Sequence, residues 1–287
     1  MNASDLSLKS LYISRSAKKC YSFPSYISHR YTQVSGTRHS GRDCRNPDYR
    51  DVNLRVDKKG TDTEKRIGPR RVTQSGLMTA EAVLISGLVC FALASLFAVP
   101  LLLQGGWVIL TIGVLSLLCG YVYTGGPFPL AYVGLGEVFV LLFFGILAVL
   151  GVYFLQTDQV DWRTLLSGTQ IGLLATGLIA INNLRDAQGD RETRKRTLAV
   201  RFGKRFGRAE IAFLSLAPFV LGMLWLRAGM VWAAALPLLA LPLGIRIARQ
   251  VAHTEPGPVY NRYLAQSAGL HLLFGVLLSV GYLLSGR

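Results

Sequence analysis

Two aspartates near the middle of the chain have a spacing that suits metal binding. Asp186 and Asp190 are four residues apart, just beyond the apolar run 165–181. If the helix predicted by that run continues, both side chains lie on one face, one turn apart. Carboxylate oxygens are the ligands that Mg²⁺ prefers. The spacing therefore predicts that Asp186 and Asp190 hold a magnesium ion at the mouth of a membrane helix.

Basic residues crowd around these two aspartates. The same stretch carries Arg185, Arg191, Arg194, Lys195 and Arg196. Arginine and lysine donate charge-assisted hydrogen bonds to phosphate oxygens. Metal-binding carboxylates beside such a cluster favour diphosphate chemistry at a membrane surface. A solvated basic loop next to a membrane span has the same composition and remains the alternative.

A second charged stretch, residues 57–76, precedes the first apolar run that is long enough to span a bilayer. It mixes Asp57 and Asp62 with Arg70 and five further Lys or Arg residues, and its Gly and Pro residues indicate a loop. If both charged stretches lie on one side of the membrane, they predict a bipartite site. One metal centre then lies on each side of a bound diphosphate, and the Arg and Lys side chains neutralise the remaining charge.

The composition indicates an integral membrane protein. The chain has 287 residues, of which 51% are hydrophobic and only 16% charged, whereas a soluble domain carries about 25% charged residues. The net charge of +15 is explained by basic cytoplasmic loops, so we expect no nucleic-acid partner. The four cysteines form no C-x-x-C pair, which predicts neither a disulfide framework nor a cysteine metal site.

Seven apolar segments are long enough to cross a bilayer. Their limits are 79–103, 107–123, 135–156, 163–183, 209–226, 231–249 and 264–285. Backbone groups in lipid must be satisfied within the segment, so apolar runs of this length predict helices. The expected fold is an all-α polytopic transmembrane bundle of about seven spans.

The distribution of charge predicts the orientation. Residues 1–75, 184–208 and 246–262 are basic and alternate with neutral or acidic loops. By the positive-inside rule the basic regions, including the N-terminus, are cytoplasmic. Both charged stretches therefore lie on the same face of the membrane.

Several stretches of the chain resemble motifs of a known family. They are N-N-x-x-D-x-x-x-D at 182–190, K-R-T-L-A-V-R-x-G at 195–203, G-P-R-R-V-T-Q-S-G at 68–76, Y-T-G-G-P-F-P-L-A-Y-x-G-L-G-E at 123–137 and Y-N-R-Y-L at 260–264. The first resembles the second aspartate motif of UbiA-type intramembrane prenyltransferases. The others resemble one branch, the 1,4-dihydroxy-2-naphthoate polyprenyltransferases of menaquinone biosynthesis.

The resemblance implies an activity and its site. A polyprenyl group would pass from polyprenyl diphosphate to 1,4-dihydroxy-2-naphthoate, giving demethylmenaquinone, diphosphate and CO2, with Mg²⁺ as the cofactor. The implied catalytic and metal-binding residues are Asp186, Asp190 and Asp62, with Asp57 as a further metal ligand. The implied substrate-binding residues are Asn182, Asn183, Arg191, Lys195, Arg196, Arg70 and Tyr123. The expected location is a bacterial inner membrane, with a plastid membrane as the alternative.

The N-terminal part departs from the family pattern. The family's first motif reads N-D-x-x-D-x-x-x-G-x-D, and with Gly60 as the anchor only Asp62 matches an aspartate; the two earlier positions fall on Asn53 and Val56. The family has nine helices, and the two missing ones would precede residue 57. We therefore expect residues 1–56 to be a basic segment that is disordered, a transit segment or unrelated to the fold, and 57–287 to form the transmembrane prenyltransferase domain.

Other functions remain open at this point. The acceptor could be another aromatic compound, such as 4-hydroxybenzoate or homogentisate. The chain could also be an inactive, N-terminally defective remnant or a transporter-like protein. Transporters tend to place their sites near the bilayer midplane, whereas the charges here gather at one mouth of nearly charge-free spans. That distribution favours the enzyme.

Overall fold

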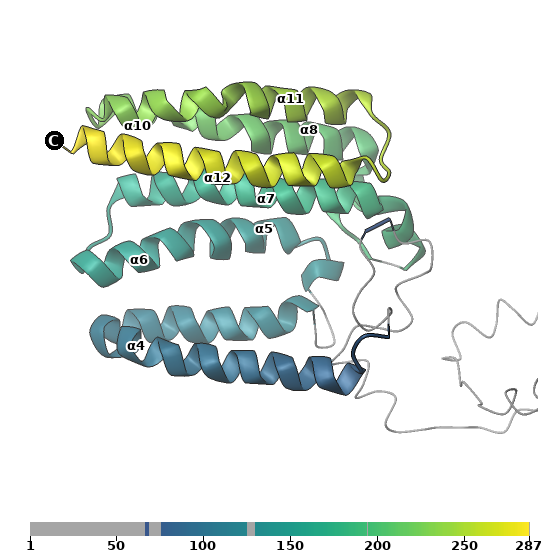
Figure 1. Ribbon diagram of the computed structural model, residues 1–287, viewed down its shortest axis with the longest axis horizontal. Coiled ribbons are helices and arrows are strands. Elements are labelled where there is room, and N and C mark those ends of the chain that lie inside the picture. Colours follow the sequence, from purple (N-terminus) through teal and green to yellow (C-terminus); the bar gives the residue numbers. More distant parts are fainter. Residues whose placement is uncertain (1–66, 69–75, 125–129, 194, 287) are drawn as a thin grey trace, which may run out of the picture. The chain divides into compact units, whose positions relative to one another are not determined.

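The structure is a computed structural model that describes residues 67–68, 76–124, 130–193 and 195–286. All of them belong to the unit Asp51–Arg287. Their helices are α4 (Ala80–Thr124), η1 (Leu130–Tyr132), α5 (Gly136–Leu141), η2 (Leu142–Ile146), α6 (Leu147–Thr157), α7 (Trp162–Glu192), α8 (Leu198–Leu221), α9 (Leu224–Arg227), α10 (Val231–Ala235), η3 (Leu236–Ala240), α11 (Leu241–His253) and α12 (Tyr260–Ser285). The described residues contain no strand, which agrees with the predicted all-α bundle (Figure 1).

Helix α4 is a hairpin rather than one rod. A straight helix of 45 residues would be about 68 Å long, more than twice the thickness of the hydrocarbon layer. The chain reverses at Gly106, whose φ of 51° lies in the left-handed region that favours glycine. Figure 1 shows the two arms of α4 side by side, and they correspond to the predicted spans 79–103 and 107–123.

The predicted number of spans is confirmed. Six helices of the described chain are long and apolar enough to cross a membrane, and the doubled α4 raises the number of crossings to seven. Three of the six are composite, one being Leu198–Arg227, which α8 and α9 form. Helices α5, η2 and α6 form the span Gly136–Thr157, and α10, η3 and α11 form Val231–His253.

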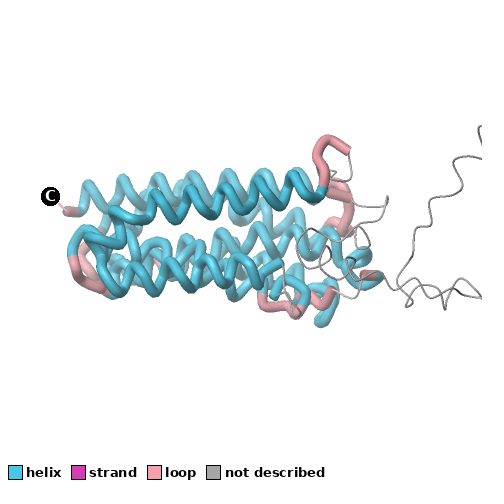
Figure 2. The backbone as a smooth tube through the Cα atoms, turned by 90° about the horizontal axis from the view of Figure 1, so that it is seen from below, coloured by secondary structure: helices cyan, strands magenta, loops and turns pink. Residues whose placement is uncertain are grey.

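Helix α7 lies at the centre of the packing. It contacts α5, η2, α6, α8 and α12. Helix α12 runs beside it in Figure 1, and Figure 2 shows the long helices running lengthwise through the bundle. Its side chains Leu174, Ile181 and Leu184 are fully or almost fully buried, with Ile211 of α8 and Phe274 of α12 in the same core. The outward side chains of α4 are apolar and exposed, as expected for a surface that faces lipid.

Small residues allow the first half of α7 to approach its neighbour closely. A Cβ added to Gly145 of η2 would lie 2.5 Å from the carbonyl oxygen of Gly168 and would collide with the Cα of Gly172. Membrane helices pack mainly by such close backbone contact, because lipid provides no hydrophobic drive for their association. This crossing fixes how α5 and α6 lie on α7.

A buried polar link ties α7 to the irregular end of α8. The Gln170 side chain is fully buried; its Nε2 donates to the carbonyl of Pro218 at 2.7 Å, and its Oε1 accepts from Nε1 of Trp225 at 3.0 Å. Both polar groups of the amide are therefore satisfied where no water is available.

The basic loops lie at the same end of the bundle. The end of α7, the start of α8 and the α11–α12 loop are neighbours (Figure 1), and Glu255 of that loop pairs with Lys204 at 2.6 Å and with Arg208 at 2.8 Å. This arrangement agrees with the predicted common face of the segments 184–208 and 246–262. Its assignment to the cytoplasm remains a prediction.

Candidate active site

The end of α7 carries the two central aspartates. The helix is continuous from Trp162 to Glu192, so Asp186 and Asp190 lie one turn apart, as the sequence predicted. Asp161 starts the helix by accepting from the backbone N–H of Arg163. Because α7 packs in the core and continues beyond it, both carboxylates lie at the end of the bundle.

Asp190 is paired with a lysine from the following turn. Nζ of Lys195 donates to Oδ2 of Asp190 at 3.0 Å, and the backbone N–H of Lys195 donates to the Asp190 carbonyl at 2.8 Å. Both side chains are mostly covered, with 19% of Lys195 and 14% of Asp190 exposed. The ammonium group is therefore held next to the carboxylate rather than free in solvent.

Asp186 is held by a buried arginine. Nε and Nη2 of Arg185 donate to the two carboxylate oxygens of Asp186 at 2.8 and 2.7 Å. The same guanidinium donates to Oδ1 of Asn182 at 2.7 Å and to Oδ1 of Asn261 at 2.6 Å. Asn261 also donates to the carbonyl of Ile67 at 3.4 Å. One guanidinium therefore fixes Asp186 and joins α7 to the start of α12.

A second buried contact joins α7 to α5. Nδ2 of Asn183 donates to Oε1 of Glu137 at 2.7 Å, and both residues are at least 94% buried. The other oxygen of Glu137 is buried and has no hydrogen-bond partner among the described residues. The Tyr123 hydroxyl lies close by, 3.3 Å from the position that a Cβ on Gly136 would occupy.

The loop before α5 is fastened to the turn after α7. The backbone N–H of Arg196 donates to the Tyr132 carbonyl at 2.8 Å, and Arg201 donates to the Val133 carbonyl at 2.7 Å. Gly134 has a φ of 78°, and a Cβ there would lie 2.6 Å from the Arg196 carbonyl. Glycine is required at this position by both the backbone conformation and the close approach.

The structure brings many of the predicted site residues together. Asn182, Asn183, Asp186, Asp190 and Lys195 lie at the end of α7 and in the turn after it, in three separate sets of contacts. Arg196 joins this region through its backbone and Tyr123 through its proximity to Gly136. The side chains of Arg191 and Arg196 are exposed at the same end of α7. Asp57, Asp62 and Arg70 lie outside the described residues, and so does the proposed boundary after residue 56.

Sequence reasoning did not assign roles to three residues of this region. Arg185 is one of several basic neighbours in the sequence, and among those that the structure describes it is the buried one. Glu137 and Asn261 lie inside longer sequence motifs that do not by themselves give them a role. Their positions within those motifs, Y-x-G-L-G-E and Y-N-R-Y-L, were the available signal.

The donor chemistry of the two aspartates fits a magnesium ion. Mg²⁺ commonly binds through one or two carboxylates together with water and substrate phosphates. The described residues contain no cluster of three or more His, Cys, Asp or Glu side chains that could hold a metal alone. Each carboxylate oxygen has two lone pairs, so pairing with Arg185 or Lys195 leaves acceptor capacity for a cation. A site at Asp186 and Asp190 would depend on a bound diphosphate to complete it.

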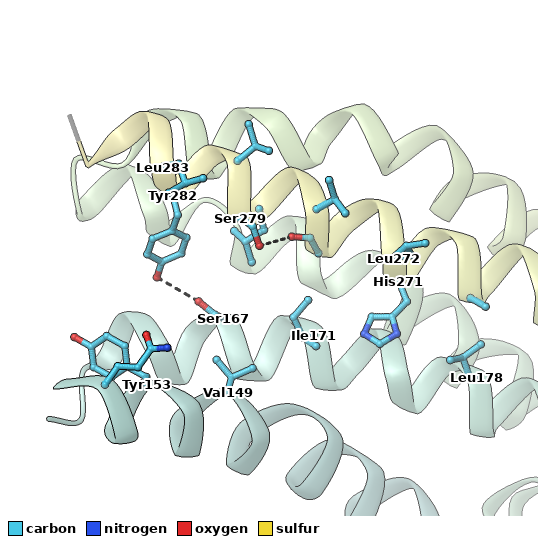
Figure 3. Close-up of a pocket in the computed structure, with 16 residues that line it drawn as sticks. Val149, Tyr153, Ser167, Ile171, Leu178, His271, Leu272, Ser279, Tyr282 and Leu283 are labelled. Carbon is cyan, nitrogen blue, oxygen red and sulfur yellow. Dashed lines mark hydrogen bonds between the residues drawn. The ribbon is translucent and has the colours of Figure 1, made fainter. Parts of the chain in front are cut away.

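An apolar cavity of about 1000 Å³ runs along α7 towards this region. It lies between α6, α7 and α12 and extends from Ser167 to Leu178, which is one turn before Asn182 (Figure 3). Val149, Ile171 and Leu272 are among its lining side chains. Its polar residues lie mainly towards the far end, where the hydroxyls of Ser167 and Tyr282 are 3.2 Å apart.

Comparison with known proteins identifies similar sequences. The model of the UbiA prenyltransferase family matches residues 57–279. The chain is 38% identical over 236 residues to a 1,4-dihydroxy-2-naphthoate octaprenyltransferase of Escherichia coli, covering 79% of this chain and 76% of the relative. Proteins of the same name are 36% identical over 234 residues in Haemophilus influenzae, with the same coverage, and 34% identical over 236 residues in Mycobacterium tuberculosis, covering 80% and 77%.

Proposed function

Because this chain belongs to the UbiA prenyltransferase family, we propose that it transfers a polyprenyl group to 1,4-dihydroxy-2-naphthoate in menaquinone biosynthesis. The donor is a polyprenyl diphosphate. The observation that carries the proposal is the end of α7, where Asp186 and Asp190 lie one turn apart beside Lys195. The relatives named above support the acceptor.

The proposed reaction breaks two bonds and forms one. The bond from the first prenyl carbon to the diphosphate oxygen breaks, and its electron pair leaves with the diphosphate. The ring carbon that bears the carboxylate bonds to the prenyl carbon. That carboxylate then leaves as CO2, and its bonding pair restores the aromatic ring. The product is demethylmenaquinone in its reduced quinol form.

The residues at the end of α7 bind and neutralise the leaving group. Asp186 and Asp190 would hold Mg²⁺, which when bound stabilises negative charge on the departing diphosphate. Lys195 is held beside Asp190 at 3.0 Å, so it can donate to a phosphate oxygen without leaving the site. We assign Arg191, Arg196 and Arg70 to the same anion. Asp62 and Asp57 would hold a further Mg²⁺ for it.

The apolar cavity suits the donor's tail. A polyprenyl chain is long and apolar, and the cavity beside α7 leads to within one turn of Asn182. An allylic cation must be kept from water until the ring attacks it, which the mainly apolar lining favours. The site lies at the end of the bundle that carries the basic loops, so we place it on the cytoplasmic side of a bacterial inner membrane.

Prenyl transfer by isolated membranes tests the proposal. Membranes containing the full chain are incubated with a polyprenyl diphosphate and 1,4-dihydroxy-2-naphthoate labelled in its carboxylate, with and without Mg²⁺. We expect labelled CO2 and a prenylated quinol only when Mg²⁺ is present. A folded chain that releases neither would contradict the proposal and favour an inactive remnant.

A further inference from the structure

Glu137 is a buried carboxylate that the structure leaves half satisfied. It is 5% exposed; its Oε1 accepts from Asn183 at 2.7 Å, and its Oε2 has no hydrogen-bond partner in the described part of the chain. A buried polar atom without a partner is costly, more so when it belongs to a charged group. The arrangement leaves an acceptor available for a donor that the described residues do not supply.

This oxygen lies next to the diphosphate site. Asn183, which holds Glu137, precedes Asp186 by three residues on α7, a rise of about 4.5 Å along the helix axis. The loop before α5 is clamped to the turn that carries Lys195 and Arg196 through the Arg196–Tyr132 backbone bond. Glu137, the last residue of the motif 123–137, is therefore held where that motif meets the motif 195–203.

The group that would pair with Oε2 of Glu137 must be a hydrogen-bond donor. This requirement excludes the anionic diphosphate. A metal shared with the two aspartates is not supported, since the described residues form no group of three metal-binding side chains. A phenolic hydroxyl is the donor that the proposed reaction brings to this place, because the acceptor ring carries two of them.

We infer that Oε2 of Glu137 accepts a hydrogen bond from a ring hydroxyl of the aromatic acceptor. This inference rests on the proposed function and adds to it a residue that selects and orients the acceptor. Sharing the hydroxyl proton with a carboxylate raises the electron density of the ring, which favours its attack on the prenyl carbon. The bond also fixes the ring at a set distance from the end of α7.

The experiment measures acceptor binding separately from turnover. Purified full-length chain in detergent is titrated anaerobically with 1,4-dihydroxy-2-naphthoate and with each of its two monomethyl ethers, followed by naphthalene fluorescence. The variants are Glu137→Gln and, as a matched control, Glu81→Gln, which changes an exposed carboxylate in the first turn of α4. Hydrogen bonds to charged groups imply that Glu137→Gln weakens binding about tenfold to hundredfold.

The ethers give a second measurement on the unaltered protein. One of the two should bind the wild type more weakly by a similar factor, because a methoxy group cannot donate. Glu137→Gln should no longer discriminate against that ether, since its amide can donate to the ether oxygen. Glu81→Gln should behave as the wild type, and the Mg²⁺ dependence of prenyl transfer should be the same in all three proteins.

Failure of this inference differs from failure of the proposed function. If the wild type neither binds nor prenylates the naphthoate, both the proposed function and the inferred role of Glu137 are contradicted. If the wild type does both, yet neither ether nor Glu137→Gln alters affinity, the inference alone is overturned. Should Glu137→Gln lose its fold in thermal denaturation, the ethers on the wild type still decide.

Discussion

Arg185 should be essential for the stability of the site, and replacing it tests the observed network. The guanidinium makes four hydrogen bonds, two to Asp186 and one each to Asn182 and Asn261, and its side chain is 2% exposed. Arg185→Met keeps the apolar length and removes every donor. Breaking a buried ion pair from one side costs about 3–5 kcal/mol. Asp186 is 21% exposed, so water offsets part of the loss, and we expect about 3 kcal/mol.

Arg185→Lys separates charge from geometry. Lysine keeps the positive charge but cannot reproduce the planar fork that reaches Asp186 and both asparagines. If the bonds to Asn182 and Asn261 are lost and one to Asp186 remains, the expected cost is about 2 kcal/mol. Arg191→Met is the matched control, because this arginine is exposed, and its effect on stability should stay within about 0.5 kcal/mol.

Thermal unfolding of the purified full chain in detergent measures this order. The wild type and Arg191→Met should unfold at the highest temperature, followed by Arg185→Lys and then Arg185→Met. The Mg²⁺ concentration for half-maximal prenyl transfer should rise in both Arg185 variants, since Asp186 loses its fixed orientation. If Arg185→Met unfolds like the wild type and needs no more Mg²⁺, the positioning role of Arg185 is refuted.

Two further predictions concern packing and pH. Gly145→Ala should lower the unfolding temperature, because overpacking a tight helix crossing costs about 1–3 kcal/mol. Gly269→Ala is the control and should leave the unfolding temperature unchanged, since its added Cβ has no neighbour within 4 Å. Equal effects of the two substitutions would contradict the close crossing at Gly145. Hydrogen bonds from Lys204 and Arg208 lower the pKa of Glu255. The folded-state pKa of Glu255 lies below its unfolded-state pKa. The ion pairs of Glu255 with Lys204 and Arg208 are therefore intact above the ordinary pKa of about 4.3 and are lost as the pH falls through the lowered pKa. After correction for the intrinsic pH dependence, hydrogen exchange of the α11–α12 loop should therefore be faster in acid than at neutral pH in the wild type. In Glu255→Gln the corrected exchange rate should vary less with pH.

The local features of the site could be predicted from the sequence. The spacing of Asp186 and Asp190 on a continuing helix depends only on helical periodicity, and the structure confirms it. The reversal at Gly106 follows from the length limit of a membrane span. The common end of the basic loops follows from the alternation of charge.

Contacts between helices could not be predicted in the same way. Asn183 and Glu137 are 46 residues apart, and their pairing depends on how α5 and η2 lie on α7, which they approach closely at Gly145 of η2. Arg185 and Arg191 have the same side chain six positions apart, yet one is buried and the other exposed. Which of them meets Asn261 depends on the face of α7 that packs against α12, and no local pattern of charge specifies that face.

The central claim is that Asp190 belongs to a metal-dependent diphosphate site, and one activity measurement tests it most directly. Membranes containing the wild type, Asp190→Asn or Asp158→Asn are compared at matched protein levels over a range of Mg²⁺ concentrations. Asp158 lies at the opposite end of the bundle with a φ of 54°, which asparagine also tolerates, so that variant should match the wild type. We predict that Asp190→Asn lowers prenyl transfer about a hundredfold or more; wild-type activity with an unchanged Mg²⁺ requirement in Asp190→Asn would contradict the claim.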